Sequence, residues 1–161
     1  MTAPSPALVY QKTPDAVRLD GILDELAPPV LDRLAQELAA NKGIALDVAG
    51  LRRINSLGVR AWCDFMKKLS GHKVVFRRCS PAFVDQLNSV SDFRGDAHIE
   101  SFIAPYLCES SGNVFYEELT VGKDIDKGNY SALTGRRCSE CPEPLVFDDL
   151  PERYLHFLAF L

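Results

Sequence analysis

The amino-acid sequence predicts an α/β protein: a mixed β-sheet with helices packed on one face, plus a small loop-rich, ribbon-like C-terminal extension. Two observations predict this fold class. Short apolar runs typical of strands alternate with amphipathic helical segments through the first hundred residues. From residue 105 this alternation gives way to glycine, charged and isolated polar residues. We therefore expect one domain over residues 1–104 and an extension over residues 105–161.

The chain is expected to begin with a β-hairpin and a helix. Apolar-rich runs at 7–11 and 16–20 lie on either side of Pro14 and Asp15, a pair typical of turns. From 29 to 41, apolar residues recur at helical spacing and polar residues lie on the opposite face.

The middle of the domain is predicted to contain a central strand and a second helix. The run 44–48 is apolar except for Asp47, which is typical of a strand covered on both faces. After a loop over 49–54, a helix begins near Asn55 or Ser56, whose side chains suit an N-cap. Its expected buried face comprises Val59, Trp62, Met66 and Leu69.

Four further elements are predicted from local signals. Residues 74–76 form a strand, and Ser80 followed by Pro81 opens a third helix. An edge strand is expected over 98–102, and a last short helix begins at Pro151. The side chains expected to dock that helix on the main domain are Tyr154, Leu155, Leu158 and Leu161.

The composition argues against nucleic acid as a partner. The chain has 161 residues, 47% of them hydrophobic and 25% charged, with a formal net charge of -4. A core is therefore feasible, and there is no positive excess to neutralise phosphates. The N-terminus lacks the basic and apolar stretches of a signal peptide, and no run approaches a membrane span in length. We expect a cytoplasmic protein without direct membrane insertion.

Several segments carry a family resemblance through their order. Ile44–Val59 combines an apolar strand containing Asp, a loop, a polar pair ahead of Gly58, and a helix. Residues 19–24 and 73–90 supply a second strand and a later strand and helix. Together they resemble the STAS domain, found in anti-sigma-factor antagonists and sulfate-transporter tails, over residues 7–103. The resemblance implies a domain that functions by binding proteins.

The resemblance also implies a site. In regulatory STAS domains, the loop before the second helix docks a kinase and carries the serine or threonine that the kinase phosphorylates. The matching residues are Asn55, Ser56 and Leu57, where the family pattern is Asp-Ser-Ser-Gly or Asp-Ser-Thr-Gly. Ser56 is the candidate phosphoacceptor; alternatively, Ser56 or Asn55 only caps the helix. The implied partner-binding residues are Arg52, Arg53, Asn55, Ser56, Leu57 and Gly58.

The extension carries a candidate zinc site. Cys138 and Cys141 have the spacing of a zinc knuckle, in which two thiolates of one turn occupy adjacent corners of a tetrahedron. Cys108 begins a similar turn, with Ser111 in place of the second cysteine. Cys108, Cys138 and Cys141 are therefore the candidate ligands and zinc is the candidate cofactor.

Three interpretations of these cysteines are compatible with the sequence. In the first, they bind zinc together with His98, an acidic side chain or water. In the second, the ribbon has lost its metal and is held by hydrophobic packing. The third is redox activity, which needs a helix start beside a strand, whereas polar loop residues surround the pair. The other two cysteines, Cys63 and Cys79, lie in apolar patterns and are expected in the core.

By resemblance, the expected function is that of a non-enzymatic bacterial signalling module, similar to an anti-sigma-factor antagonist and switched at Ser56. Its partner would be a kinase or an anti-sigma-like protein. The alternative is a constitutive adaptor or structural subunit of a larger complex, such as a lipid-transport or polarity assembly, indifferent to Ser56. An enzyme ranks last because no acid–base, nucleophilic or phosphate-binding set of residues is complete.

Overall fold

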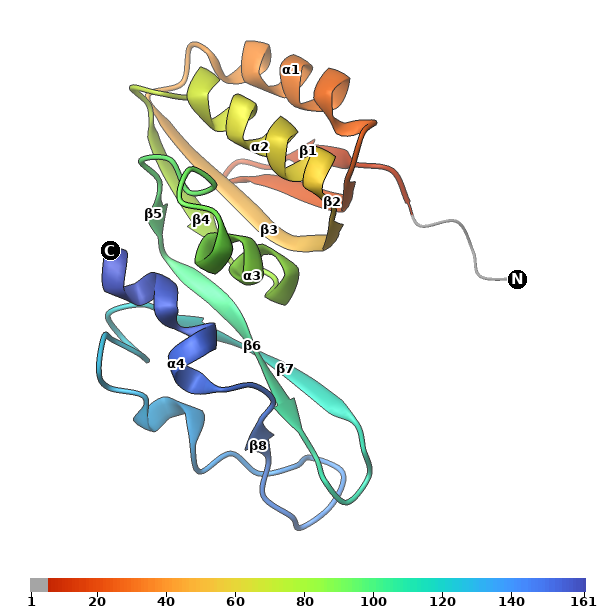
Figure 1. Ribbon diagram of the computed structural model, residues 1–161, viewed down its shortest axis with the longest axis vertical. Helices are drawn as coiled ribbons and strands as arrows, with labels where there is room; N and C mark the ends of the chain where they lie inside the picture. The colour runs from red at the N-terminus through yellow and green to blue at the C-terminus, as the bar shows by residue number, and fades with distance from the viewer. Residues whose placement is uncertain (1–5) are drawn as a thin grey trace.

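Two β-sheets build the molecule in the computed structural model, which describes residues 6–161 (Figure 1). The strands of the first sheet are β1 (Val9–Lys12), β2 (Val17–Leu23), β3 (Gly43–Ile54), β4 (Lys73–Arg77) and β5 (His98–Ile99). Its helices are α1 (Ala27–Leu38), α2 (Ser56–Lys68) and α3 (Pro81–Ser89). The second sheet contains β6 (Ser101–Leu107), β7 (Val114–Thr120) and β8 (Val146–Phe147). The remaining elements are η1 (Ser131–Leu133), α4 (Pro151–Tyr154) and η2 (His156–Phe160).

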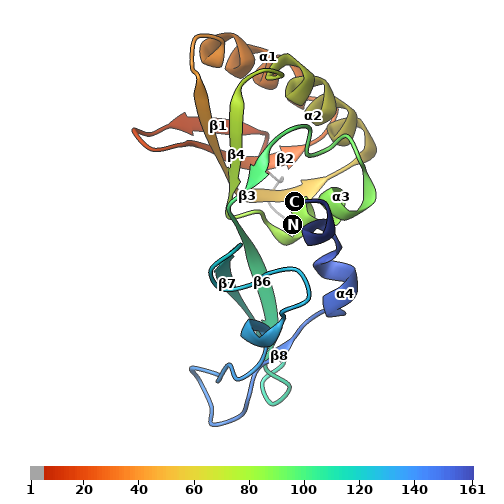
Figure 2. The same cartoon turned by 90° about the vertical axis from the view of Figure 1, so that its left-hand side faces the viewer.

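The first sheet is mixed and is covered by helices on one face. Its strand order is β1-β2-β3-β4-β5, with β1 antiparallel to β2 and the other neighbours parallel. The three helices lie on the same side of this sheet (Figure 2). The predicted α/β fold class is therefore confirmed, as are the opening hairpin and the first three helices. Among the described residues, no helix has the length and apolar content needed to cross a membrane.

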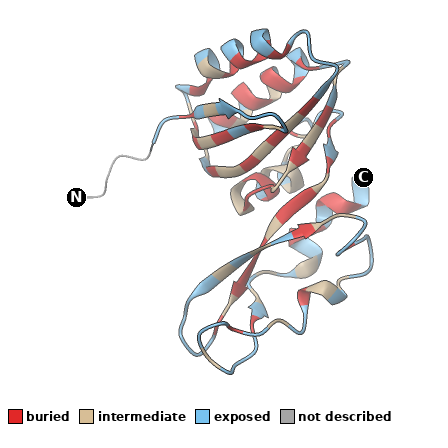
Figure 3. Ribbon diagram, turned by 180° about the vertical axis from the view of Figure 1, so that it is seen from behind, coloured by how far each residue is buried: buried red, intermediate tan, exposed pale blue. Residues whose placement is uncertain are grey.

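The core lies between this sheet and its helices, and aromatic rings fill its centre. Buried residues alternate with more exposed ones along β2 and β3 (Figure 3), so each strand has one covered face. Trp62 of α2 is fully buried, and its ring centroid lies 5.3–5.9 Å from those of Phe65, Phe76, Phe83 and Phe93. Its indole N–H donates to the Phe93 carbonyl at 3.0 Å, which satisfies the one polar atom of the ring.

Strand β3 is longer than the sequence analysis predicts. The prediction of a loop over 49–54 is wrong, because these residues continue β3 and pair with β2 in parallel. Gly50 lies within β3, where it allows close approach of β2: a Cβ there would lie 2.7 Å from the Leu19 carbonyl oxygen. A Cβ on Gly50 would lie 1.9 Å from Oδ1 of Asp20 on the neighbouring strand. The missing side chain therefore permits the strand pairing that continues to Ile54.

The C-terminal half contains two departures from the predicted elements. The expected edge strand over 98–102 is split, because β5 ends in the first sheet and β6 starts in the second. Strand β7, within the segment expected to be loop-rich, is missed. Glu117 and Glu118 are consecutive, so they point to opposite faces of β7 and obscure any apolar alternation. Each is satisfied by a distant residue: Arg136 pairs with Glu117 at 2.5 Å, and the Ser101 hydroxyl donates to Glu118 at 2.7 Å.

Polar contacts join the two sheets where the chain passes from one to the other. Arg78 follows β4, with a positive φ of 49°, and its guanidinium donates two hydrogen bonds to Asp47 of β3. Its backbone N–H donates to the Ser101 hydroxyl of β6 at 2.9 Å. The Arg78 side chain therefore contacts the first sheet while its backbone contacts the second.

The C-terminal segment docks on α3 and β6. The Tyr154 hydroxyl donates to the Ile103 carbonyl at 2.6 Å, and the Phe157 ring packs edge-on against Phe102 with centroids 5.4 Å apart. The short helix predicted at Pro151 is confirmed as α4. Of its expected docking side chains, Tyr154, Leu155 and Leu158 are buried, whereas Leu161 is exposed.

Replacing Asn88 with alanine is expected to loosen this docking. The Asn88 side chain donates to the Tyr154 carbonyl at 2.9 Å and accepts from the Phe157 N–H at 2.8 Å. Losing two such bonds should lower the free energy of unfolding by about 2 kcal/mol. Urea unfolding and limited proteolysis of the C-terminus measure the effect. Asn41→Ala, an exposed site after α1, is the control, and equal behaviour of the two variants would contradict the expectation.

Candidate functional site

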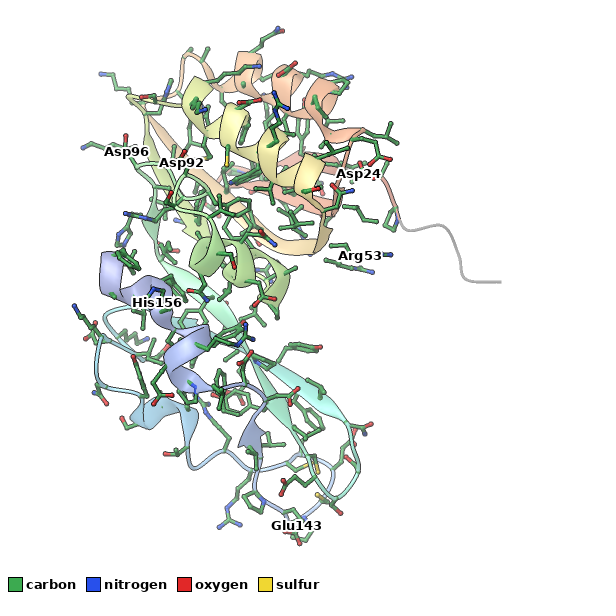
Figure 4. All side chains as sticks on the ribbon, viewed as in Figure 1. Asp24, Arg53, Asp92, Asp96, Glu143 and His156 are labelled. Atoms are coloured by element: carbon green, nitrogen blue, oxygen red, sulfur yellow. The ribbon has the colours of Figure 1, made fainter. Side chains whose placement is uncertain are left out.

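The residues implied as a partner surface lie at the end of β3 and in the first turn of α2. Arg52, Arg53, Asn55, Ser56 and Leu57 are all exposed, and only Gly58 is buried. Figure 4 shows the side chains of Arg53 and Asp24 at this edge of the first sheet. Arg53, Asn55, Ser56 and Leu57 therefore lie on one solvent-facing edge, which we call the α2 surface. Arg52 does not, because consecutive strand residues point to opposite faces, and its side chain lies beside Ser80, Pro81 and Tyr116.

Asn55 is the cap of α2. Its side-chain oxygen accepts from the Gly58 N–H at 2.9 Å, and its amide nitrogen donates to Glu25 at 3.4 Å. Ser56 is the first residue of the helix and is exposed, and its hydroxyl makes no hydrogen bond within residues 6–161. Of the two residues considered as the cap, Asn55 therefore fills that role and Ser56 does not.

Gly58 fixes how closely α2 approaches the sheet. A Cβ at this position would lie 1.9 Å from the Leu23 carbonyl oxygen and 2.2 Å from its carbonyl carbon. The Asn55 N–H donates to that same oxygen at 3.1 Å. The polar pair ahead of a glycine thus has a physical reason: the cap and the glycine together seat the first turn of α2 on the end of β2.

Two large apolar side chains are exposed on this edge. Leu57 is 54% exposed, and Leu26, at the start of α1, is 66% exposed. The hydrogen bond between Asn55 and Glu25 holds the starts of the two helices together. The sequence analysis missed Glu25 and Leu26, because they lie thirty residues upstream and no local motif links them to the loop.

A shallow pocket adjoins the α2 surface. Its volume is about 340 Å³, and it lies between the ends of β2 and β3, next to the Asn55 cap. The side chains around it are Ile22, Asp24, Glu25, Arg53, Ile54 and Asn55. The pocket therefore brings the carboxylates of Asp24 and Glu25 and the Arg53 guanidinium to the edge of the α2 surface.

The second candidate site is the cysteine cluster, formed by Cys108, Cys138 and Cys141. The three Sγ atoms lie within 4.8 Å of one another, and those of Cys108 and Cys141 are 3.4 Å apart. Ligands about 2.3 Å from a tetrahedral zinc ion would be about 3.8 Å apart. Cys108 and Cys138 are buried and Cys141 is partly buried. The cluster could therefore hold a metal ion.

Hydrogen bonds set the order in which these thiols ionise. The hydroxyl and then the backbone N–H of Ser111 lower the pKa of Cys108 to about 7. The backbone of Glu143 lowers the pKa of Cys141, but Cys108, burial and Cys138 outweigh it and raise that pKa to about 11. Cys108 therefore ionises before Cys141, and a metal must displace the proton of Cys141.

The remaining candidates lie elsewhere. His98 is in β5, separated from the cluster by β6, whose length is about 20 Å at 3.3 Å per residue. This separation excludes it as a fourth ligand. Cys138 and Cys141 lie in the loop between η1 and β8, away from any helix start. Cys79 is fully buried in the core, where burial raises its pKa, whereas Cys63 is only partly buried.

The fold and these two sites define an α/β protein with an exposed helix-start surface and a three-cysteine cluster that could hold a metal. No protein-family model matches the chain, and no curated protein matches it.

Proposed function

We propose that the protein is a non-enzymatic regulatory module, similar to an anti-sigma-factor antagonist, that binds a partner protein through the α2 surface. One observation carries the proposal: Asn55 caps α2, so the exposed Ser56 hydroxyl, next to exposed Leu57, has no hydrogen-bond partner within residues 6–161. A serine that does not cap its helix is available for another role. The mixed sheet with helices on one face agrees with the fold that the STAS resemblance implies.

The chemistry of the α2 surface suits a switch. Exposed Leu57 and Leu26 supply apolar contact area, and exposed Arg53 supplies positive charge. A phosphate on Ser56 would be tolerated by the helix N-terminus, where backbone N–H groups and the positive end of the dipole face it. The added charge would place an anion in the middle of an apolar contact and weaken binding.

We also propose that the cysteine cluster binds zinc and that this zinc is structural. Strand β8 has only two residues, so few main-chain bonds hold the 138–141 turn to the rest of the second sheet. A metal ion held by Cys108 and this turn would join the end of β6 to a loop that lies thirty residues further along the chain.

Photocrosslinking tests the partner surface. A photoreactive residue at position 57 should trap a defined protein in the source cells, and the same residue at position 150 should not. Leu150 is a matched control because it is 67% exposed and lies before α4, away from the α2 surface. Absence of any crosslink at 57 above the level at 150 would contradict the proposal.

The Ser56→Glu variant is expected to reduce that crosslink at least tenfold, because one carboxylate in an apolar contact costs more than about 1.4 kcal/mol. Ser56→Ala, which adds no charge, should retain the crosslink. Equal crosslinking by both variants would favour the alternative, a constitutive adaptor or subunit of a larger complex. Mass spectrometry of the protein from its own cells reports a phosphate on Ser56 independently.

A further inference from the structure

We infer that a metal ion in the cysteine cluster keeps one exchangeable coordination position, beside Ser111, that takes a neutral nitrogen donor of the imidazole class from outside the chain. The inference rests on the proposed metal binding. It follows from the geometry of the two turns that carry the cysteines, from exposure at the fourth corner, and from the charge around it.

The two turns are built alike. The Cys108 N–H donates to the carbonyl of Asn113 at 2.9 Å, and the Cys138 N–H donates to the carbonyl of Glu143 at 3.1 Å. In each turn, the N–H of the cysteine therefore bonds to the carbonyl of the residue five positions later. Ser111 lies three residues after Cys108, and Cys141 lies three residues after Cys138. Ser111 is therefore the structural counterpart of Cys141.

The Ser111 side chain belongs to the first of these turns. Its hydroxyl accepts from the Asn113 N–H at 3.2 Å, and the N–H of the next residue, Gly112, donates to the Cys108 carbonyl at 2.7 Å. The Asn113 side chain in turn donates to Glu140 at 3.0 Å, which holds the two turns against each other. A metal ion in the cluster would thus have sulfur at three corners, and by turn position Ser111 stands where the fourth sulfur would be.

A serine hydroxyl does not close this site. A hydroxyl remains protonated at neutral pH and is a poor ligand compared with a thiolate or an imidazole. Ser111 is exposed, whereas Cys108 and Cys138 are buried, so the fourth corner is the one that faces solvent. Three protein ligands with an open corner is the arrangement of zinc sites that exchange their fourth ligand.

Charge selects the class of that ligand. Three thiolates around a divalent ion leave a net charge of about −1. The turns add the carboxylates of Glu109, Glu140 and Glu143. Of the two arginines directly before Cys138, Arg136 pairs with Glu117, so Arg137 alone offsets these three negative charges. A further anion would be repelled by this group, whereas a neutral imidazole would not, and zinc accepts nitrogen as readily as sulfur. A histidine side chain of another protein is the natural form of such a donor.

Cobalt(II) spectroscopy tests the inference, with imidazole as the probe and a phosphine reductant present. Imidazole should shift the visible bands of the cobalt-loaded protein in a saturable way, and 2-mercaptoethanol should do so more weakly. Ser111→Cys should supply a fourth thiolate, raise cobalt affinity about a hundredfold, and abolish the response to imidazole. Ser110→Ala, at an exposed serine of the same turn, should bind cobalt and respond as the natural protein does.

Three outcomes overturn the inference while leaving metal binding intact. They are a wild-type spectrum that imidazole does not change, a Ser111→Cys variant that still responds, and a stronger response to the thiol than to imidazole. Failure of the wild-type protein to take up cobalt or zinc at all would instead overturn the proposed metal site. The two failures are therefore distinguishable in one titration series.

Discussion

Gly58→Ala is expected to lower the free energy of unfolding by about 3 kcal/mol or more, a large effect for the addition of one methyl group. The new Cβ would lie 1.9 Å from the Leu23 carbonyl oxygen. Neither atom can turn aside, because the position of a Cβ is fixed by its own backbone and the oxygen belongs to the backbone of β2. Alanine favours helix over glycine by about 1 kcal/mol, which offsets only part of this cost. The first turn of α2 would have to move off the end of β2.

Gly43→Ala is the matched control for Gly58→Ala. Gly43 starts β3, and nothing lies within 4 Å of the Cβ it would gain, so its stability should change by no more than about 0.5 kcal/mol. Urea unfolding followed by Trp62 fluorescence measures both variants, because Trp62 lies on α2 itself. Similar unfolding midpoints for the two variants would show that α2 does not require a glycine at position 58.

The sequence predicts the elements whose signals are local. Asn55 and Ser80 both cap helices, and each forms its bond with the N–H three residues later, so the start of α2 and α3 can be found in a short window. The helical spacing of apolar residues likewise locates the core around Trp62.

The elements missed are those whose signals come from distant residues. Gly50 suggests a loop by itself, and only the contact with Asp20 explains why a strand needs a glycine there. In β7, the sequence alone suggests an exposed loop at Glu117 and Glu118, because their partners Arg136 and Ser101 lie elsewhere in the chain. Neither partner lies within the seven residues of the strand.

The same distinction applies to the sites. The three cysteines were found because each turn has a fixed local spacing, and the fold then brings the two turns together across thirty residues. Leu26 lies on the α2 surface because the start of α1 is next to the start of α2, which the sequence alone does not show. Local spacing therefore predicts ligands of a turn, whereas a binding surface assembled from two helices requires the fold.

Cys138→Ser is expected to lower the affinity for zinc about a hundredfold. A structural zinc site contributes about 10 kcal/mol or more, so each of three thiolates accounts for about 3 kcal/mol. Cys138 suits this test because it is buried and its Sγ also accepts a hydrogen bond from the Glu140 N–H at 3.4 Å. Zinc titration against a competing chelator measures the affinity.

Removal of zinc should destabilise the natural protein but not the Cys138→Ser variant. Zinc at a thousand times its dissociation constant stabilises a fold by about 4 kcal/mol, so a chelator should lower the unfolding midpoint of the natural protein markedly. The chelator should leave the unfolding midpoint of this variant nearly unchanged. Cys63→Ser, which replaces a partly buried cysteine on α2 outside the cluster, should behave as the natural protein does.

Hydrogen exchange should rise on zinc removal at β8 and the end of β6 before it rises in the first sheet, because the cluster lies next to the second sheet. Zinc uptake by Cys138→Ser equal to that by Cys63→Ser would show that these three thiols do not form one site.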